Sequence, residues 1–239
     1  MMTDGRIIRS MDSGLYIAAS GMLAEQVQQT QLSNDLANAS TPGYKTQQGV
    51  QQSFGDLLLA NTSTGQPIGA IATGVRIGKS IADTTPNTLQ QTGQPLNFGI
   101  AGQGYFAVRT PSGVRYTRDG QFGSNNKSQL VDAAGDLVLG QNGQPVTVSA
   151  KGTVDPSALG VFTVNNATQQ GSTLWSGTPA GKATGIVKQG ELEQSGVDAV
   201  HTMTDMIASL RAYQAGQSAI QSIDQTMQED ASSVPGLGG

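Results

Sequence analysis

Apolar side chains near the amino end of the chain recur at helical spacing. Between residues 14 and 37 they form one stripe compatible with a heptad repeat. The stripe consists of Leu15, Ala18, Met22, Leu32 and Leu36. Pro42 and Gly43 mark the end of this helix, because proline cannot continue a helix and glycine permits a turn. The pattern predicts a long N-terminal helix within residues 11–45.

A second apolar stripe follows the carboxyl end of the chain. Its members recur at helical steps of three and four positions between residues 197 and 229. They are Val200, Met203, Ile207, Leu210, Tyr213, Ile220 and Met227. Glutamine residues interleave the stripe, so this helix is weakly amphipathic and needs partners to be stable. We therefore expect a C-terminal helix within residues 186–230 and a flexible tail over residues 231–239.

Between the helices, the pattern changes to short runs of β-forming residues separated by turn sequences. Residues 105–108 and 114–117 are two such runs. Dipeptides typical of hairpin turns, such as Asp119-Gly120 and Asn142-Gly143, lie between the runs. The pattern predicts a central antiparallel β domain over residues 96–185, preceded by an extended connector over residues 46–95.

These elements define an α+β fold class. The two long terminal helices are expected to pair as a coiled-coil-like bundle, with an antiparallel all-β domain inserted between them. Residues 1–10 have no clear pattern and are expected to form a disordered extension. Each apolar stripe could form the core of a domain or an assembly surface, and the glutamine-rich opposite faces favour assembly with further copies.

Composition removes several classes of function. The formal charge is −4, from 13 basic and 17 acidic residues, and no basic cluster is present, so nucleic acid is not an expected partner. The chain has no cysteine and a single histidine, which excludes thiol chemistry and a histidine- or cysteine-based metal centre. We expect no metal, no cofactor and no small-molecule substrate.

Three local patterns could suggest an enzyme. Gly102 and Gly104 form a G-x-G sequence, but a strand rather than a helix follows it, so a nucleotide loop is not favoured. His201 shares a helix face with two aspartates, which is more typical of a polar helix surface than of a catalytic group. Glu191 and Glu193 alternate across a strand and do not converge. Catalysis is therefore not expected.

Several segments carry a family resemblance. The N-terminal segments resemble the signature of bacterial flagellar rod and hook proteins, and further segments resemble the central and C-terminal parts of that family. The segments are residues 15–22, 34–45, 89–96, 102–106, 116–120, 190–198 and 210–214. Within the N-terminal signature, the positions taken as the family motif are Asn34, Asn38, Thr41, Gly43 and Tyr44. The chain's length resembles that of the larger rod proteins, distal or proximal.

The resemblance implies a structural subunit of the flagellar basal-body rod. Such subunits self-assemble, together with neighbouring rod and hook subunits, into the axial shaft that transmits torque to the hook and filament. The two apolar stripes would then be the assembly interface. The resemblance also implies export by the flagellar type III apparatus without a cleaved signal peptide, to the basal body in the cell envelope and periplasmic space.

Two observations accord with that route. No standard secretory signal is evident in residues 1–10, and the longest strongly apolar run, residues 57–60, is far too short to cross a membrane. Insertion into the membrane is therefore not expected. The alternative function is a secreted binding or adhesive module, in which the β domain recognises a ligand and the helices only pair with each other.

Overall fold

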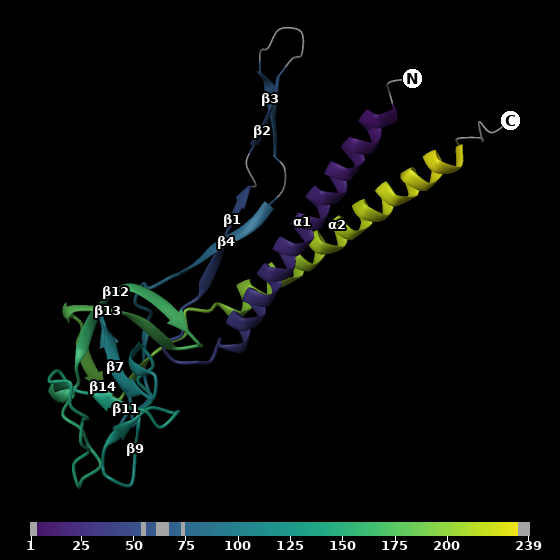
Figure 1. The fold of residues 1–239 in the computed structure, drawn as a ribbon. Coiled ribbons are helices and arrows are strands. Elements are labelled where there is room, and N and C mark those ends of the chain that lie inside the picture. The colour runs from purple at the N-terminus through teal and green to yellow at the C-terminus, as the bar shows by residue number, and fades with distance from the viewer. Residues whose placement is uncertain (1–3, 54–55, 61–66, 73–74, 234–239) are drawn as a thin grey trace. The chain divides into compact units, whose positions relative to one another are not determined.

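The computed structural model describes residues 4–53, 56–60, 67–72 and 75–233. Two long helices and a set of β-strands form an α+β fold, shown in Figure 1. The chain divides into two compact units, each built from separate stretches of sequence. The helical unit comprises Met1–Asn34, Gln47–Ile81 and Val200–Gly239, and the β unit comprises Asp35–Thr46 and Ala82–Ala199.

The helical unit contains most of both helices and two pairs of strands. Helix α1 spans Asp4–Ala37 and helix α2 spans Ala199–Ser233, and they run side by side in opposite directions (Figure 1). The strands are β1 (Gln47–Ser53), β2 (Asp56–Ala60), β3 (Pro67–Ala72) and β4 (Val75–Ala82). Strand β1 pairs with β4, and β2 pairs antiparallel with β3.

The β unit is built from short antiparallel strands. They are β5 (Leu89–Gln91), β6 (Phe98–Ala101), β7 (Tyr105–Thr110), β8 (Gly113–Thr117), β9 (Gly123–Ser124), β10 (Leu130–Val131), β11 (Leu137–Leu139), β12 (Val161–Gln170), β13 (Leu174–Lys182), β14 (Ile186–Gln189) and β15 (Glu191–Glu193). Seven of them form one sheet in the order β12-β13-β8-β7-β11-β10-β9, and β12 also pairs with β7. Strand β14 pairs with β6, and β15 pairs with β5.

The core of the β unit consists of two apolar clusters. The larger cluster contains Phe98, Phe106 and Leu130, each of them fully buried. The smaller cluster is centred on Trp175, whose ring packs against the ring of Tyr105 at a centroid distance of 6.0 Å. Burial of these large side chains supplies the main stabilisation of the β unit, because the hydrophobic effect scales with the apolar area removed from water.

The element boundaries correct several expectations. Helix α1 begins at Asp4, within the segment 1–10 that was expected to be disordered; residues 1–3 of that segment lie outside the described residues. The connector 46–95, which was expected to be extended, contains the strands β1 to β5, and each of them pairs with another strand.

The C-terminal segment also differs from its expected bounds. Residues 186–193 belong to β14 and β15, and α2 starts only at Ala199. The physical reason is that their backbone groups are satisfied by pairing with β6 and β5. At the other end, α2 continues to Ser233, so the expected tail is helical over residues 231–233, and its remaining residues lie outside the described part of the chain.

Candidate assembly surface and buried junction

Helices α1 and α2 approach each other at several levels along their length. The Ser209 hydroxyl donates a hydrogen bond to the Glu25 carbonyl oxygen at 3.2 Å. Gly216 faces Met22 so closely that a Cβ atom on this glycine would lie 2.8 Å from Cγ of Met22. Gly14 lies next to Ile223. The matched pairs run in opposite order along the two helices, so α1 and α2 are antiparallel at these three levels.

The buried and half-buried residues of α2 follow a heptad repeat, and we call this set, which includes the contacts with α1 at Ser209, Gly216 and Ile223, the seam. Between residues 202 and 227, the residues that are not exposed recur at alternating steps of four and three, with Asp205 as the only addition. They are Thr202, Met206, Ser209, Tyr213, Gly216, Ile220, Ile223 and Met227. The seam includes Thr202, Ser209 and Gly216, whose side chains are small enough to let the backbones of α1 and α2 come close.

The predicted interface residues fall on different faces of the helices. On α2, Tyr213, Ile220 and Met227 lie in the seam. The other four predicted residues face outward, and Val200 and Leu210 are 77% and 41% exposed. We call this outward set the ridge: Val200, Met203, Ile207 and Leu210. On α1, the predicted residues Leu15, Ala18, Met22, Leu32 and Leu36 are all half-buried.

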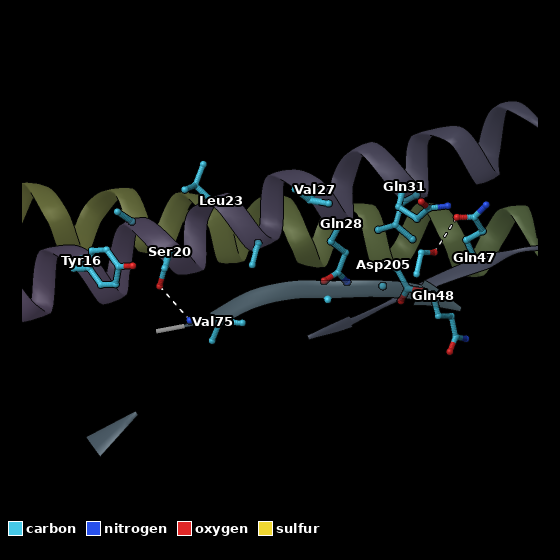
Figure 2. Close-up of a pocket in the computed structure, with 16 residues that line it drawn as sticks. Tyr16, Ser20, Leu23, Val27, Gln28, Gln31, Gln47, Gln48, Val75 and Asp205 are labelled. Carbon is cyan, nitrogen blue, oxygen red and sulfur yellow. Dashed lines mark hydrogen bonds between the residues drawn. The ribbon is translucent and has the colours of Figure 1, made fainter. Parts of the chain in front are cut away.

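A groove lies between α1 and the strands β1 and β4 in the helical unit (Figure 2). Its volume is about 900 Å³, and its apolar lining includes Tyr16, Leu23 and Val27. At its floor, the backbone N–H of Val75 donates to the Ser20 hydroxyl at 3.2 Å, which ties β4 to α1. The groove is therefore an open apolar surface beside the helix. The groove could not be predicted from the sequence, because it depends on how β1 and β4 pack against α1.

The family motif residues Asn38, Thr41, Gly43 and Tyr44 lie together where the chain leaves α1. Gly43 has a φ angle of +67°, and its N–H donates to the Glu193 carbonyl oxygen at 2.9 Å. The Tyr44 hydroxyl donates to Asp35 Oδ1 at 2.7 Å, and burial together with this carboxylate raises the pKa of Tyr44. The Ser195 hydroxyl donates to the Asn38 carbonyl oxygen at 2.9 Å.

Of the remaining motif positions, Thr41 forms a side-chain hydrogen bond with Asn38. Its hydroxyl donates to Asn38 Oδ1 at 3.2 Å. Asn34 is exposed on α1 and belongs to the helical unit, so the structure does not bring it into this junction. The motif therefore specifies the turn after α1 and the way in which that turn meets the segment around Glu193.

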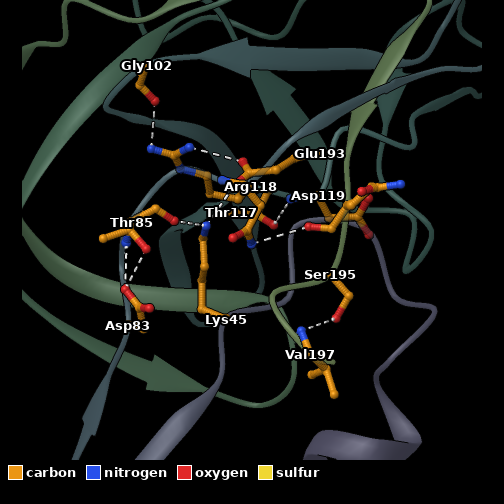
Figure 3. A network of polar contacts seen from close by, with 12 residues as sticks. Lys45, Asp83, Thr85, Gly102, Thr117, Arg118, Asp119, Glu193, Ser195 and Val197 are labelled. Atoms are coloured by element: carbon orange, nitrogen blue, oxygen red, sulfur yellow. Dashed lines mark hydrogen bonds and ion pairs between the residues drawn. The ribbon is translucent and has the colours of Figure 1, made fainter. Parts of the chain in front are cut away.

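A buried ion network lies beside this turn (Figure 3). The Glu193 carboxylate accepts from Lys45 Nζ at 2.6 Å and from Arg118 Nη1 at 3.0 Å, and all three side chains are at most 1% exposed. The backbone N–H of Asn87 donates to the same carboxylate at 2.8 Å. Lys45 also donates to the Thr85 carbonyl oxygen. Burial lowers the pKa of Lys45, and the hydrogen bond that Lys45 donates to Glu193 opposes that shift.

We call the turn and this network the junction, defined by Gly43, Tyr44, Lys45, Arg118 and Glu193. Lys45, Arg118 and Glu193 lie within the segments that resemble the family, but the sequence pattern did not indicate that they form a common site. The available indication was that each is a charged residue within a segment resembling the family, in a chain with only 13% charged residues. The network joins parts of the chain that are far apart in sequence, and it can hold the turn rigidly because every charge has a partner.

Of the residues considered for catalysis, only Glu193 belongs to the junction, where its carboxylate pairs with Lys45 and Arg118. The side chain of His201 is 76% exposed and lies 3.5 Å from Asp205. Glu191 is partly exposed beside Lys188, whereas Glu193 is buried. Gly102 and Gly104 have φ angles of +103° and +132°, so they are required by backbone conformation.

A metal site or a membrane span would need particular residues within the described part of the chain. Among these residues there is no group of three or more histidine, cysteine, aspartate or glutamate side chains placed to hold a metal ion. Neither of the described helices is long and apolar enough to span a membrane.

Comparison with protein families gives three matches spread along the chain. The family described as flagella basal body rod protein matches residues 15–45. The flagellar hook protein FlgE/F/G D1 domain matches residues 99–156. The C-terminal domain of the flagellar basal body rod FlgEFG proteins matches residues 188–234. Each of the three matches contains part of the junction: Gly43, Tyr44 and Lys45 lie in the first, Arg118 in the second and Glu193 in the third.

Similar proteins cover nearly the whole chain. The flagellar basal-body rod protein FlgG of Caulobacter vibrioides is 31% identical over 255 aligned positions, covering 90% of this chain and 96% of the relative. The flagellar basal-body rod protein FlgF of the same organism is 29% identical, covering 95% and 99%. The flagellar hook-basal body complex protein FlhO of Bacillus subtilis is 29% identical, covering 94% and 99%. The chain therefore belongs to the flagellar basal-body rod protein family and is a structural subunit of the flagellar rod.

Proposed function

We propose that this chain polymerises through its helical unit into the axial shaft that transmits torque to the hook and filament. The observation that carries the proposal is the apolar surface left exposed after α1 and α2 have paired. On α1, Tyr16, Leu23 and Val27 are 57%, 63% and 52% exposed, and the ridge is exposed on α2. Covering such side chains with another subunit stabilises an assembly by roughly 25 cal/mol per Å² of apolar area.

The two predicted stripes have different parts in this proposal. The residues of the seam hold α1 and α2 together as a coiled-coil-like pair within one subunit. The exposed residues of the ridge and of α1 contact other subunits. This division is supported by burial, because a half-buried seam residue has already lost most of its contact with water and has little to gain from a neighbour.

The junction contributes rigidity to the proposed subunit. A shaft under torque requires that each subunit resist bending, and a turn held by a buried ion network and a tyrosine–aspartate hydrogen bond resists it better than a solvated loop does. The family motif at this turn is thus explained by its part in keeping the turn rigid. The proposal also includes assembly with neighbouring rod and hook subunits. It further includes export by the flagellar type III apparatus without a cleaved signal peptide and a final place in the cell envelope. Membership of the rod family supports these parts of the proposal.

The alternative of a secreted binding or adhesive module has no support in these matches. The choice between a distal and a proximal rod position stays open, since both FlgG and FlgF proteins are similar to this chain. Catalysis is not part of the proposal, because the family is not known as an enzyme family.

Replacement of Leu210 by aspartate tests the proposal. Leu210 is exposed in the single chain, so the purified L210D protein should keep the melting temperature of the unsubstituted chain. In cells that lack the unsubstituted chain, L210D should abolish swimming and prevent the rod from forming, because a charge would be buried between subunits. Ala208→Asp is the matched control, since Ala208 is also exposed on α2 but lies on another face. Normal rods and normal swimming with L210D would contradict the proposal.

A further inference from the structure

The groove beside α1 has the properties of a surface that another molecule covers (Figure 2). Tyr16, Leu23 and Val27 line it and are more than half exposed. Among the described residues that line it, Asp205 is the only charged one. Little charge has to be dehydrated when the groove is filled, and apolar area is gained. The groove therefore fits an apolar and nearly uncharged occupant.

The ridge on α2 has matching chemistry and a suitable length. Its four residues carry no charge and no strong hydrogen-bonding group, and all are exposed. From Val200 to Leu210 the ridge extends about 15 Å along the helix, at a rise of about 1.5 Å per residue. The part of α1 from Tyr16 to Leu32, which borders the groove, extends about 24 Å by the same measure. The ridge is short enough to lie within the groove.

The ridge cannot enter the groove of its own chain. Asp205 lies at the edge of that groove, and it stands two positions after Met203 and two positions before Ile207. Two positions turn a helix by about 200°, so the ridge lies on the side of α2 opposite to Asp205. Within the described part of the chain, the ridge therefore does not reach the groove of its own copy, and each surface is open to a second molecule.

The charges at the rims are also complementary. Asp205 is at the rim of the groove, and its side chain is 43% exposed. Arg211 is an exposed residue four positions after Ile207, which places it on the same face of α2, at the rim of the ridge. When a ridge lies in a groove, a basic rim can therefore meet an acidic rim, which would set the register of the contact.

We propose that the ridge of one copy docks into the groove of the next copy of this chain. The inference rests on the proposed function and deepens it by naming the two faces that meet. Because ridge and groove are different surfaces, the contact runs head to tail and can repeat without closing into a pair. A contact of ridge with ridge would bury only the ridges and would stop at two copies.

Disulfide cross-linking tests this contact, since the chain contains no cysteine of its own. One copy carries Ile207→Cys in the ridge, and a second copy carries Val27→Cys in the groove. Both are produced together in cells that lack the unsubstituted chain, and rods are isolated and mildly oxidised. We expect a product of twice the chain mass only when both variants are present. Ala208→Cys with Val27→Cys is the matched control and should give no such product.

Each other outcome overturns the inference. Rods that form without the cross-linked product would leave the proposed function standing and remove this contact. A product from Ile207→Cys alone would show ridge against ridge. A product of another mass would show that a different subunit fills the groove. Failure of the unsubstituted chain to enter any rod would instead contradict the proposed function itself.

Charge reversal at the rims gives an independent measurement. Arg211→Glu places two acidic groups together at the rims, and Asp205→Lys places two basic groups together. We expect each single variant to reduce the swimming radius roughly twofold or more, and the double variant to recover most of that loss. A double variant as impaired as the two single variants combined would count against the proposed docking.

Discussion

Gly43 shows how one residue determines the geometry of the junction. A Cβ atom at this position would lie 2.4 Å from the Arg118 carbonyl carbon, so any other residue would have to displace backbone. Its φ angle of +67° is also one that side chains other than glycine adopt at a cost. The close approach allows the Gly43 N–H to reach the Glu193 carbonyl oxygen. The glycine in the family motif is thus explained by the lack of room for a side chain beside Arg118 and by its positive φ angle.

Glu193 is the residue on which the ion network depends. Glu193→Gln would leave Lys45 and Arg118 buried without a counter-charge, and loss of one partner from a buried pair costs about 3–5 kcal/mol. We expect the free energy of unfolding of the β unit to fall by that amount. Urea unfolding followed by fluorescence measures it, since Trp175 is the only tryptophan and is buried in this unit.

The matched control for this substitution is Glu191→Gln. Glu191 pairs with Lys188 at 3.5 Å, but both side chains are partly exposed, so the control should change the free energy of unfolding by less than about 0.5 kcal/mol. Equal effects of the two substitutions would show that the buried network does not stabilise the β unit.

Asp119 makes the stability of the β unit depend on pH. Burial raises the pKa of Asp119 to about 6, although its side chain accepts a hydrogen bond from the Gln121 N–H at 2.9 Å. A carboxyl with a raised pKa binds its proton more tightly in the folded state, so its contribution to stability is present below about pH 4 and is lost as the pH rises through 6.

Asp119→Asn should remove this dependence. Asparagine keeps an oxygen for the Gln121 N–H but carries no charge, so we expect the variant to be more stable than the unsubstituted chain at pH 7.5, by about 1–2 kcal/mol after allowance for solvent screening. Near pH 4 the two should be nearly equal. Urea unfolding at both values checks this, and a difference independent of pH would contradict the assignment.

At the scale of elements, the sequence predicted both helices but not the phase of α2. The large apolar residues suggested one stripe, whereas the structure separates them into a seam and a ridge. The seam contains Thr202, Ser209 and Gly216, which a search for apolar residues passes over. Their positions follow from Tyr213, Ile220 and Met227, which stand seven residues apart and fix the heptad phase.

The presence of antiparallel β-strands was predictable from the sequence, but which strands pair with each other was less so. The alternation and turn dipeptides indicated antiparallel strands over residues 96–185, and the structure has β6 to β13 there. The pairing of β15 with β5 joins residues about a hundred positions apart, and local patterns carry no information about such contacts. For the same reason the ion network was not predicted, although its residues lie within segments that resemble the family.

At the scale of the whole molecule, the β unit is assembled from two separate stretches of chain. Residues 35–46 supply Gly43, Tyr44 and Lys45 to a unit otherwise built from residues 82–199. Residues 47–81, which belong to the helical unit, interrupt the two stretches. We therefore expect the end of α1 to contribute to the stability of the β unit, together with the strands that follow much later.

A comparison of two fragments tests this contribution. The fragment 35–199 retains the whole junction, whereas the fragment 82–199 lacks Lys45 and Tyr44. Without Lys45, Glu193 loses one of its two ion pairs, and the surfaces that residues 35–46 cover become exposed. We expect the shorter fragment to melt on the order of 10 °C lower, since a loss of about 3 kcal/mol has this effect in a domain of this size. Trp175 fluorescence reports the transition in both fragments.

Adding a synthetic peptide of residues 35–46 to the shorter fragment should raise its melting temperature, because a ligand that binds only the folded state stabilises it. Equal melting temperatures for the two fragments would mean that the family motif contributes nothing to the stability of the β unit.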